Sequence, residues 1–185
     1  MKECREHPGG GINKAKKRMN KGSTNFKKVG IPGHTELKAN VGLSRAEQTW
    51  IKRIQEALSF DLLSRKYRGR VSPFAHYVTG HCCVATEAAY YLFAKDSGYK
   101  PHVKKLGDVT HWWLFHPERK VILDVTAPQA DGFVYGQCEK WQPFQGHGKP
   151  SKRALSLMIR VLLASPKTNR TLLENVLNQA KEIST

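Results

Sequence analysis

The strongest constraint on the fold comes from one predicted helix, residues 81–95, because its side chains are unusually small. It lies within the stretch GHCCVATEAAYYLFAKDSG, residues 80–98. Its helically spaced positions are Ala85, Ala88, Ala89, Leu92 and Phe93. Small side chains let a helix approach its neighbours closely, so we expect this helix to lie centrally. Gly98 suits its C-terminal end.

Strand patterns follow directly. Residues 100–106 form a plausible first strand, 110–116 are rich in aromatic residues, and 120–126 are rich in β-branched residues. The four residues PERK between the last two predict a hairpin turn. The sequence therefore predicts a small antiparallel sheet next to the central helix.

Further helices are predicted on both sides of this core. Ser44 and Glu47 form a capping box, which opens an amphipathic helix expected to run to about Arg65. Residues 151–164 and 169–183 predict an antiparallel helix pair. We therefore expect a single α+β domain over residues 41–185.

Residues 1–40 form a different kind of segment. They carry ten Lys or Arg against three Asp or Glu, and they are rich in glycine, so we expect a flexible basic arm. The whole chain has a formal net charge of +16, which favours contact with nucleic acid or an acidic protein. The candidate contacts are Lys14, Lys16, Lys17, Arg18, Lys21, Lys27 and Lys28.

Four cysteines are present, at positions 4, 82, 83 and 138. The chain shows no signal-peptide pattern and no apolar run of membrane-spanning length, so we expect a cytoplasmic protein with free thiols and no membrane span. The cysteines do not form a C-x-x-C pair, so the sequence does not indicate a zinc ribbon or a redox motif.

Cys82 is placed at the start of the central helix. The helix dipole and the unpaired N–H groups of the first turn favour a thiolate there, which is the reactive form of cysteine. Cys83 points elsewhere and is interpreted as a small core residue. A helix-start cysteine on its own is more often a packing residue than a nucleophile.

A histidine and a carboxylate on the predicted hairpin favour a nucleophilic role for Cys82 over a packing role. Side chains alternate along a strand, and the turn brings His111 within a neighbouring diagonal of Asp124. An ionised Asp between apolar residues needs a partner. Thiol, imidazole and carboxylate would then be a nucleophile, its base and the group that orients the base.

The blocks GHC at 80–82, HWW at 111–113 and DVT at 124–126 resemble the G-x-C, H-x-W and D-x-T blocks of the transglutaminase-like family. The resemblance covers about residues 72–130. It implies a papain-like core and an acyl-enzyme mechanism without a cofactor. Cys82 would attack a peptide or other amide-bearing substrate, His111 would move the proton, and Asp124 would hold the imidazole.

The remaining site assignments concern residues that would support the reaction of Cys82. The backbone N–H of Cys82 is a candidate oxyanion donor, and Gly80 would allow close backbone approach. Tyr77, Trp113 and Thr126 are further candidate supporting residues. The aromatic, glycine-containing loop 132–148 is interpreted as a candidate lid.

Two alternatives stay open at this stage. The histidines and cysteines of this region could ligate a metal, although they lack a recognised ligand spacing, so we expect no metal. The chain could also be a nucleic-acid-binding protein on a catalytically degenerate scaffold of the same fold, with the basic arm carrying the function.

Overall fold

The structure is a computed structural model that divides into two units, residues 1–35 and 36–185. It describes residues 37–71, 75–106, 109–129, 133–135, 140–141, 143–144, 148–165 and 169–183. The seven candidate contacts of the basic arm, Lys14 to Lys28, lie outside the described residues.

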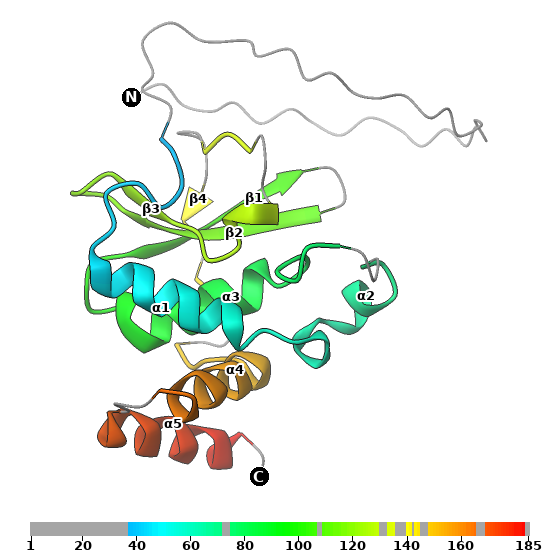
Figure 1. The fold of residues 1–185 in the computed structure, drawn as a ribbon, viewed down its shortest axis with the longest axis vertical. Coiled ribbons are helices and arrows are strands. Elements are labelled where there is room, and N and C mark those ends of the chain that lie inside the picture. Colours follow the sequence, from blue (N-terminus) through cyan, green and yellow to red (C-terminus); the bar gives the residue numbers. More distant parts are fainter. Residues whose placement is uncertain are drawn as a thin grey trace, which may run out of the picture. The chain divides into compact units, whose positions relative to one another are not determined.

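The described part of the second unit is an α+β domain (Figure 1). Its helices are α1 (Arg45–Glu56), α2 (Arg65–Arg68), α3 (Cys82–Ala89), α4 (Lys152–Leu163) and α5 (Arg170–Glu182). Its strands are β1 (Lys100–Leu106), β2 (Val109–His116), β3 (Val121–Leu123) and β4 (Lys140–Trp141). They form one antiparallel sheet in the order β3-β2-β1-β4.

Helix α3 has the central position expected from its small side chains. Its residues are almost all buried, and Ala85, Ala88 and Ala89 are fully buried. It packs against β2, α1 and α4. Figure 1 shows the resulting layers: the sheet, then α1 and α3, then α4 and α5.

The last part of this helical stretch has a wider, π-helical backbone, and the chain then enters the sheet. A π-helical segment, Tyr90–Ala94, follows α3, so the helical stretch covers most of the predicted range 81–95. Gly98 has a φ of +84°, which other residues rarely adopt, and its position confirms the predicted stop.

The capping box of α1 is confirmed, but the predicted helical end is not. Ser44 Oγ accepts from the Glu47 N–H at 3.2 Å, and Glu47 Oε2 accepts from the Ser44 N–H at 2.6 Å. The helix ends at Glu56 rather than near Arg65. After it, a short 3-10 turn places Leu62 in the core and Asp61 beside Arg160 of α4, at 2.6 Å.

The hairpin has a register close to the expected one, with Phe115 opposite Ile122. Strand β3, however, ends at Leu123, which corrects the predicted strand over 120–126. The physical reason lies in the next residue. Asp124 uses its backbone N–H and C=O to pair with the side chain of Asn40, at 2.9 and 2.8 Å, and its carboxylate binds the Thr126 N–H.

The two faces of the sheet are covered differently. One face packs on the helices through Leu114, Leu123 and the core of α3. On the other face, Trp113, Ile122 and Tyr135 form a separate apolar cluster with Leu37 and Phe133, among others. Leu37 pairs with Tyr135, and Ala39 pairs with Ile122. Residues 37–40, which the sequence placed in the arm, therefore lie on the sheet.

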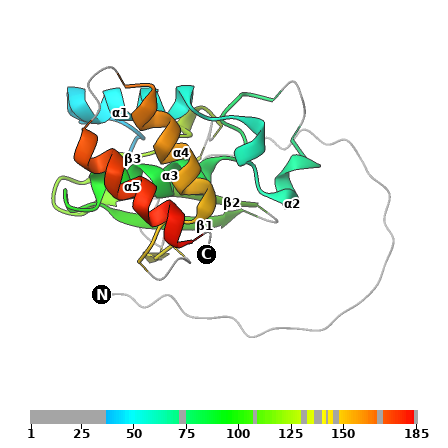
Figure 2. The same cartoon turned by 90° about the horizontal axis from the view of Figure 1, so that it is seen from below.

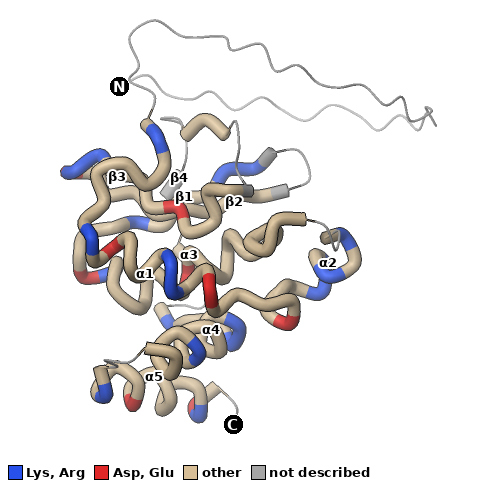
Figure 3. The backbone as a smooth tube through the Cα atoms, viewed as in Figure 1, with Lys and Arg blue, Asp and Glu red and all other residues tan. Residues whose placement is uncertain are grey.

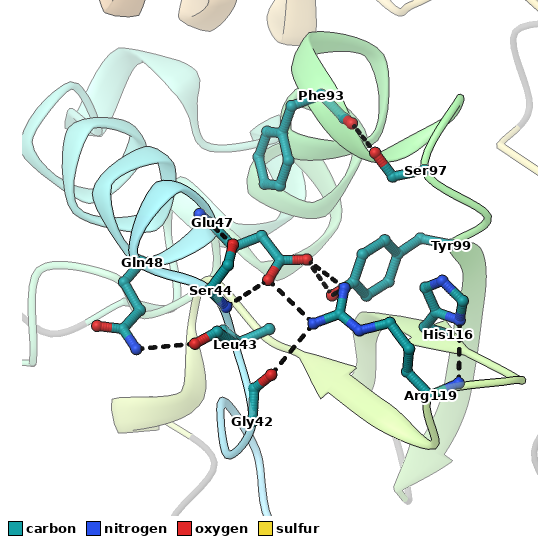
Figure 4. Close-up of polar contacts among 10 residues, drawn as sticks. All are labelled: Gly42, Leu43, Ser44, Glu47, Gln48, Phe93, Ser97, Tyr99, His116 and Arg119. Atoms are coloured by element: carbon teal, nitrogen blue, oxygen red, sulfur yellow. Dashed lines mark hydrogen bonds and ion pairs between the residues drawn. The ribbon is translucent and has the colours of Figure 1, made fainter.

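The hairpin turn is tied to the start of α1 by a buried carboxylate (Figure 4). Glu47 accepts from Arg119 at 2.8 Å and from the Tyr99 hydroxyl at 2.6 Å. Arg119 also donates to the Gly42 carbonyl at 3.1 Å. These bonds outweigh the effect of burial and lower the pKa of Glu47 to about 2.

The predicted pair of C-terminal helices is confirmed. Ser151 caps α4 by accepting from the Ala154 N–H at 3.3 Å, and Asn169 caps α5 by accepting from the Leu172 N–H at 3.1 Å. The two helices lie side by side and run antiparallel (Figure 2). Glu87 of α3 binds the Ser151 hydroxyl at 2.6 Å, which joins the central helix to this pair.

Candidate active site

Cys82 is the first residue of α3. The preceding residue, His81, makes no side-chain cap, so the N–H groups of the first turn are not satisfied by it. Gly80 has a φ of +81°, and a Cβ there would lie 3.0 Å from Leu63. This backbone conformation, together with the close packing on Leu63, explains why a glycine precedes the turn into the helix.

The Cys82 thiol lies against the start of β2. Its Sγ donates to the Thr110 carbonyl at 3.4 Å, and the thiol is close enough to His111 to contribute to the raised pKa of that imidazole. Cys82 and His111 are each 6% exposed. Of these two polar neighbours of the thiol, the backbone carbonyl of Thr110 and the imidazole of His111, only the imidazole is a base.

His111 is joined to Asp124 through its other side. The distance from His111 Nε2 to Asp124 Oδ2 is 2.6 Å. Because Nε2 is occupied, Nδ1 is the ring nitrogen left for the thiol. Burial opposes protonation of the imidazole, but the hydrogen bonds to Asp124 and Cys82 outweigh it and raise the pKa of His111 to about 9.

Asp124 is fully buried, and its carboxylate is well satisfied. Oδ1 accepts from the Thr126 N–H at 2.8 Å and from the Thr126 hydroxyl at 3.1 Å. Oδ2 accepts from His111 and from the Tyr135 hydroxyl, the latter at 2.5 Å. Four donors offset the several kcal/mol that it costs to bury a carboxylate.

The two neighbouring cysteines have different environments. Burial, with smaller contributions from Glu87 and Cys82, raises the pKa of Cys83 to about 12. Cys83 therefore stays a thiol at physiological pH and packs beside the aromatic cluster of Cys82, Trp112 and Phe144. Only Cys82 combines the helix start with a base.

Aromatic rings surround the site. Trp113 is stacked near His111 with a centroid distance of 6.1 Å, and Phe133 lies 4.9 Å from it. Phe144 stacks on Trp112 at 5.3 Å. Phe133 and Phe144 both belong to the predicted lid, loop 132–148, of which only residues 133–135, 140–141, 143–144 and 148 are described.

The supporting residues divide into two groups. Trp113 and Thr126 contact His111 and Asp124 directly. Tyr77 has an exposed side chain, and its ring is tilted against that of His76, with centroids 4.5 Å apart. Its assignment as an oxyanion donor stays a prediction.

Sequence reasoning missed two contributors to the site. Asn40 was assigned to the arm, yet it binds the backbone of Asp124 on both sides. Tyr135 was noted only as part of a candidate lid, yet its hydroxyl binds the Asp124 carboxylate. The available signal for Tyr135 was an aromatic residue in a long glycine-containing loop.

Two general findings complete the description. Among the described residues, no three His, Cys, Asp or Glu side chains are grouped as a metal site would need. None of the helices in the described part combines the length and the apolar character that a membrane crossing requires.

Comparison of the chain with protein-family models, with curated proteins and with solved structures gave no match. The resemblance to the transglutaminase-like family therefore stays a prediction from three short blocks. The functional argument depends on the geometry of the site alone.

Proposed function

We propose that the protein carries out cysteine-dependent acyl chemistry, with Cys82 as nucleophile, His111 as base and Asp124 as the group that orients the base. The observation that carries the proposal is the position of His111. Its imidazole lies 2.6 Å from the fully buried carboxylate of Asp124, and the neighbouring Cys82 side chain contributes to its raised pKa.

In the reacting form the thiol proton of Cys82 resides on His111, in agreement with the pKa of that imidazole, which is raised to about 9. The thiolate attacks the carbonyl carbon of an amide or ester, and a C–S bond forms. The tetrahedral intermediate then collapses, the C–N or C–O bond breaks, and His111 gives its proton to the leaving amine or alcohol. A thioester with Cys82 is left.

In the second half, His111 removes a proton from water or from an acceptor amine, which attacks the thioester. The C–S bond breaks, and the proton returns to the Cys82 sulfur. Hydrolysis is the default outcome because it needs no second binding site. The backbone N–H of Cys82 at the start of α3 is the proposed donor to the negative oxygen of each tetrahedral intermediate.

The three members of the site have separable roles. Cys82, at the helix start, supplies the nucleophilic sulfur, and His111 holds the proton that leaves it. Asp124 fixes the ring orientation and stabilises the imidazolium that forms after proton transfer. Cys83, with a pKa near 12, takes no part in the chemistry.

A second candidate function is binding of a polyanion. It is favoured by the net charge of +16 and by the Lys and Arg residues seen on α1, α2, α4 and α5 (Figure 3). Phosphate contacts weaken steeply with salt. Binding to an oligonucleotide that falls with salt and is unchanged in Cys82→Ser would show a function separate from the site.

The direct test uses an activated aryl ester as acyl donor. We expect mass spectrometry of the quenched protein to find one acyl group on Cys82. The adduct should be absent in Cys82→Ser and unchanged in Cys83→Ser, which is the matched control. An adduct that survives Cys82→Ser, or no adduct with any ester while the protein is folded, would contradict the proposed function.

A further inference from the structure

Tyr135 and His111 both bind Asp124 Oδ2. The hydroxyl oxygen lies 2.5 Å from Oδ2, and the His111 Nε2 lies 2.6 Å from the same atom. Thr126 donates to the other oxygen, Oδ1. The phenol and the imidazole therefore share a single acceptor inside the domain, where Tyr135 is 8% exposed.

The ring of Tyr135 is held in place from several sides. It meets Trp113 edge-on at 5.4 Å and Phe133 at 4.7 Å. Its backbone pairs with Leu37, which precedes Asn40, the residue that binds the Asp124 backbone. Packing of the ring and pairing of the backbone therefore both support the position of the hydroxyl at Oδ2.

We propose that Tyr135 is a positioning residue that limits the basicity of His111 by sharing Asp124 Oδ2 with it. This inference rests on the proposed function, because a limit on the basicity of His111 is useful only if His111 transfers a proton. The short phenol hydrogen bond draws negative charge from Oδ2, so the carboxylate stabilises the imidazolium less than it would alone.

A limit on the basicity of His111 matters because His111 also acts as a general acid. After attack, the imidazolium must release its proton to a leaving amine or alcohol, and a strongly basic imidazole releases it slowly. Asp124 must be anionic to orient the ring, and Tyr135 allows it to be anionic without holding the proton on His111 too firmly. The Tyr135 hydroxyl is hydrogen-bonded to Asp124, so Tyr135 acts through Asp124.

Tyr99 provides a matched control within the same chain. It is also a buried tyrosine whose hydroxyl donates to a buried carboxylate, Glu47, at 2.6 Å. That carboxylate binds Arg119 and has no contact with the imidazole. Tyr99→Phe therefore removes the same kind of bond at a distance from His111.

The test is an NMR titration of the His111 ring in the full chain, for wild type, Tyr135→Phe and Tyr99→Phe. We expect Tyr135→Phe to raise the pKa of His111 by roughly half a unit or more. Tyr99→Phe should leave it unchanged. An unchanged or lowered His111 pKa in Tyr135→Phe would overturn the inference.

A second substitution keeps the test decisive if Tyr135→Phe does not fold. Site-specific replacement of Tyr135 by a fluorotyrosine preserves the ring and makes the hydroxyl a stronger donor, so the pKa of His111 should fall. A rise or no change would overturn the inference. Neither titration needs turnover, so absence of an acyl adduct on Cys82 would refute the proposed function without deciding the role of Tyr135.

Discussion

Two buried carboxylates lie at opposite ends of the β2–β3 hairpin, and each accepts a hydrogen bond from a buried tyrosine. At the turn, Glu47 pairs with Arg119, a guanidinium that stays charged at all physiological pH values (Figure 4). At the open end, Asp124 pairs with His111, which gains and loses a proton. The first cluster fastens α1 to the sheet. The second places a titratable base beside a thiol.

The comparison teaches that burial and hydrogen bonding alone do not identify a reactive site. Both carboxylates are buried, and both have several donors. They differ in their neighbours: no thiol is among the described hydrogen-bond partners of Glu47, whereas the Cys82 thiol lies near enough to His111 to contribute to its raised pKa. The chemistry depends on the histidine and the thiol.

The largest expected difference concerns thiol reactivity. Asp124→Asn removes the charge that orients and stabilises the His111 imidazolium, so alkylation of Cys82 by iodoacetamide at neutral pH should slow by about 100-fold. Glu47→Gln, the matched change at the other end of the hairpin, should leave that rate unchanged. Equal effects of the two substitutions would remove the distinction between the clusters.

Much of this contrast could be predicted from the sequence. The three blocks around Cys82, His111 and Asp124 predicted which side chains come together, and helix and strand periodicity placed them on neighbouring elements. Asn40 and Tyr135 could not be found in this way, because their contacts cross 84 and 11 residues and follow no local period. The end of β3 was also predicted wrongly. Strand propensity is a local property, whereas the strand ends because the distant residue Asn40 forms hydrogen bonds with the backbone of Asp124.

The next largest effect concerns stability at the turn. Arg119→Met leaves the Glu47 carboxylate without its cation, and we expect a loss of about 1–2 kcal/mol in the free energy of unfolding, since Arg119 itself is partly exposed. Alkylation of Cys82 in the folded variant should be unchanged. Chemical denaturation measures the first quantity, and a stability equal to wild type would show that this cluster does not fasten α1.

The two clusters should also differ in the pH range over which they stabilise the fold. The pKa of His111 is raised from 6.5 to about 9, so its contribution is complete below about pH 6.5 and is lost as pH rises towards 9. The pKa of Glu47 is lowered from 4.5 to about 2, so its contribution is present above about pH 4.5 and is lost as pH falls towards 2.

Denaturation of His111→Gln and Glu47→Gln across this range measures both contributions. The stability difference between wild type and His111→Gln should shrink on the alkaline side, and that for Glu47→Gln should shrink on the acid side. The opposite order of pH ranges would contradict the assigned protonation states.

The smallest effect is expected at Asn40, whose φ is +62°. Asn40→Gly keeps that conformation accessible and removes both side-chain bonds to Asp124, so we expect a loss of about 1 kcal/mol in stability. Asn40→Ala should lose more, because alanine is strained at a positive φ. Thermal unfolding compares the two, and an alanine variant as stable as the glycine variant would contradict this account of residue 40.

The most direct test of the central claim is the rate at which Cys82 is alkylated at neutral pH, read by peptide mapping in wild type and in His111→Ala. The account predicts that wild-type Cys82 reacts far faster than Cys83 and that the preference is lost in His111→Ala. If both cysteines react at the same rate in wild type, or if folded His111→Ala keeps the preference, His111 does not act as the base for this thiol.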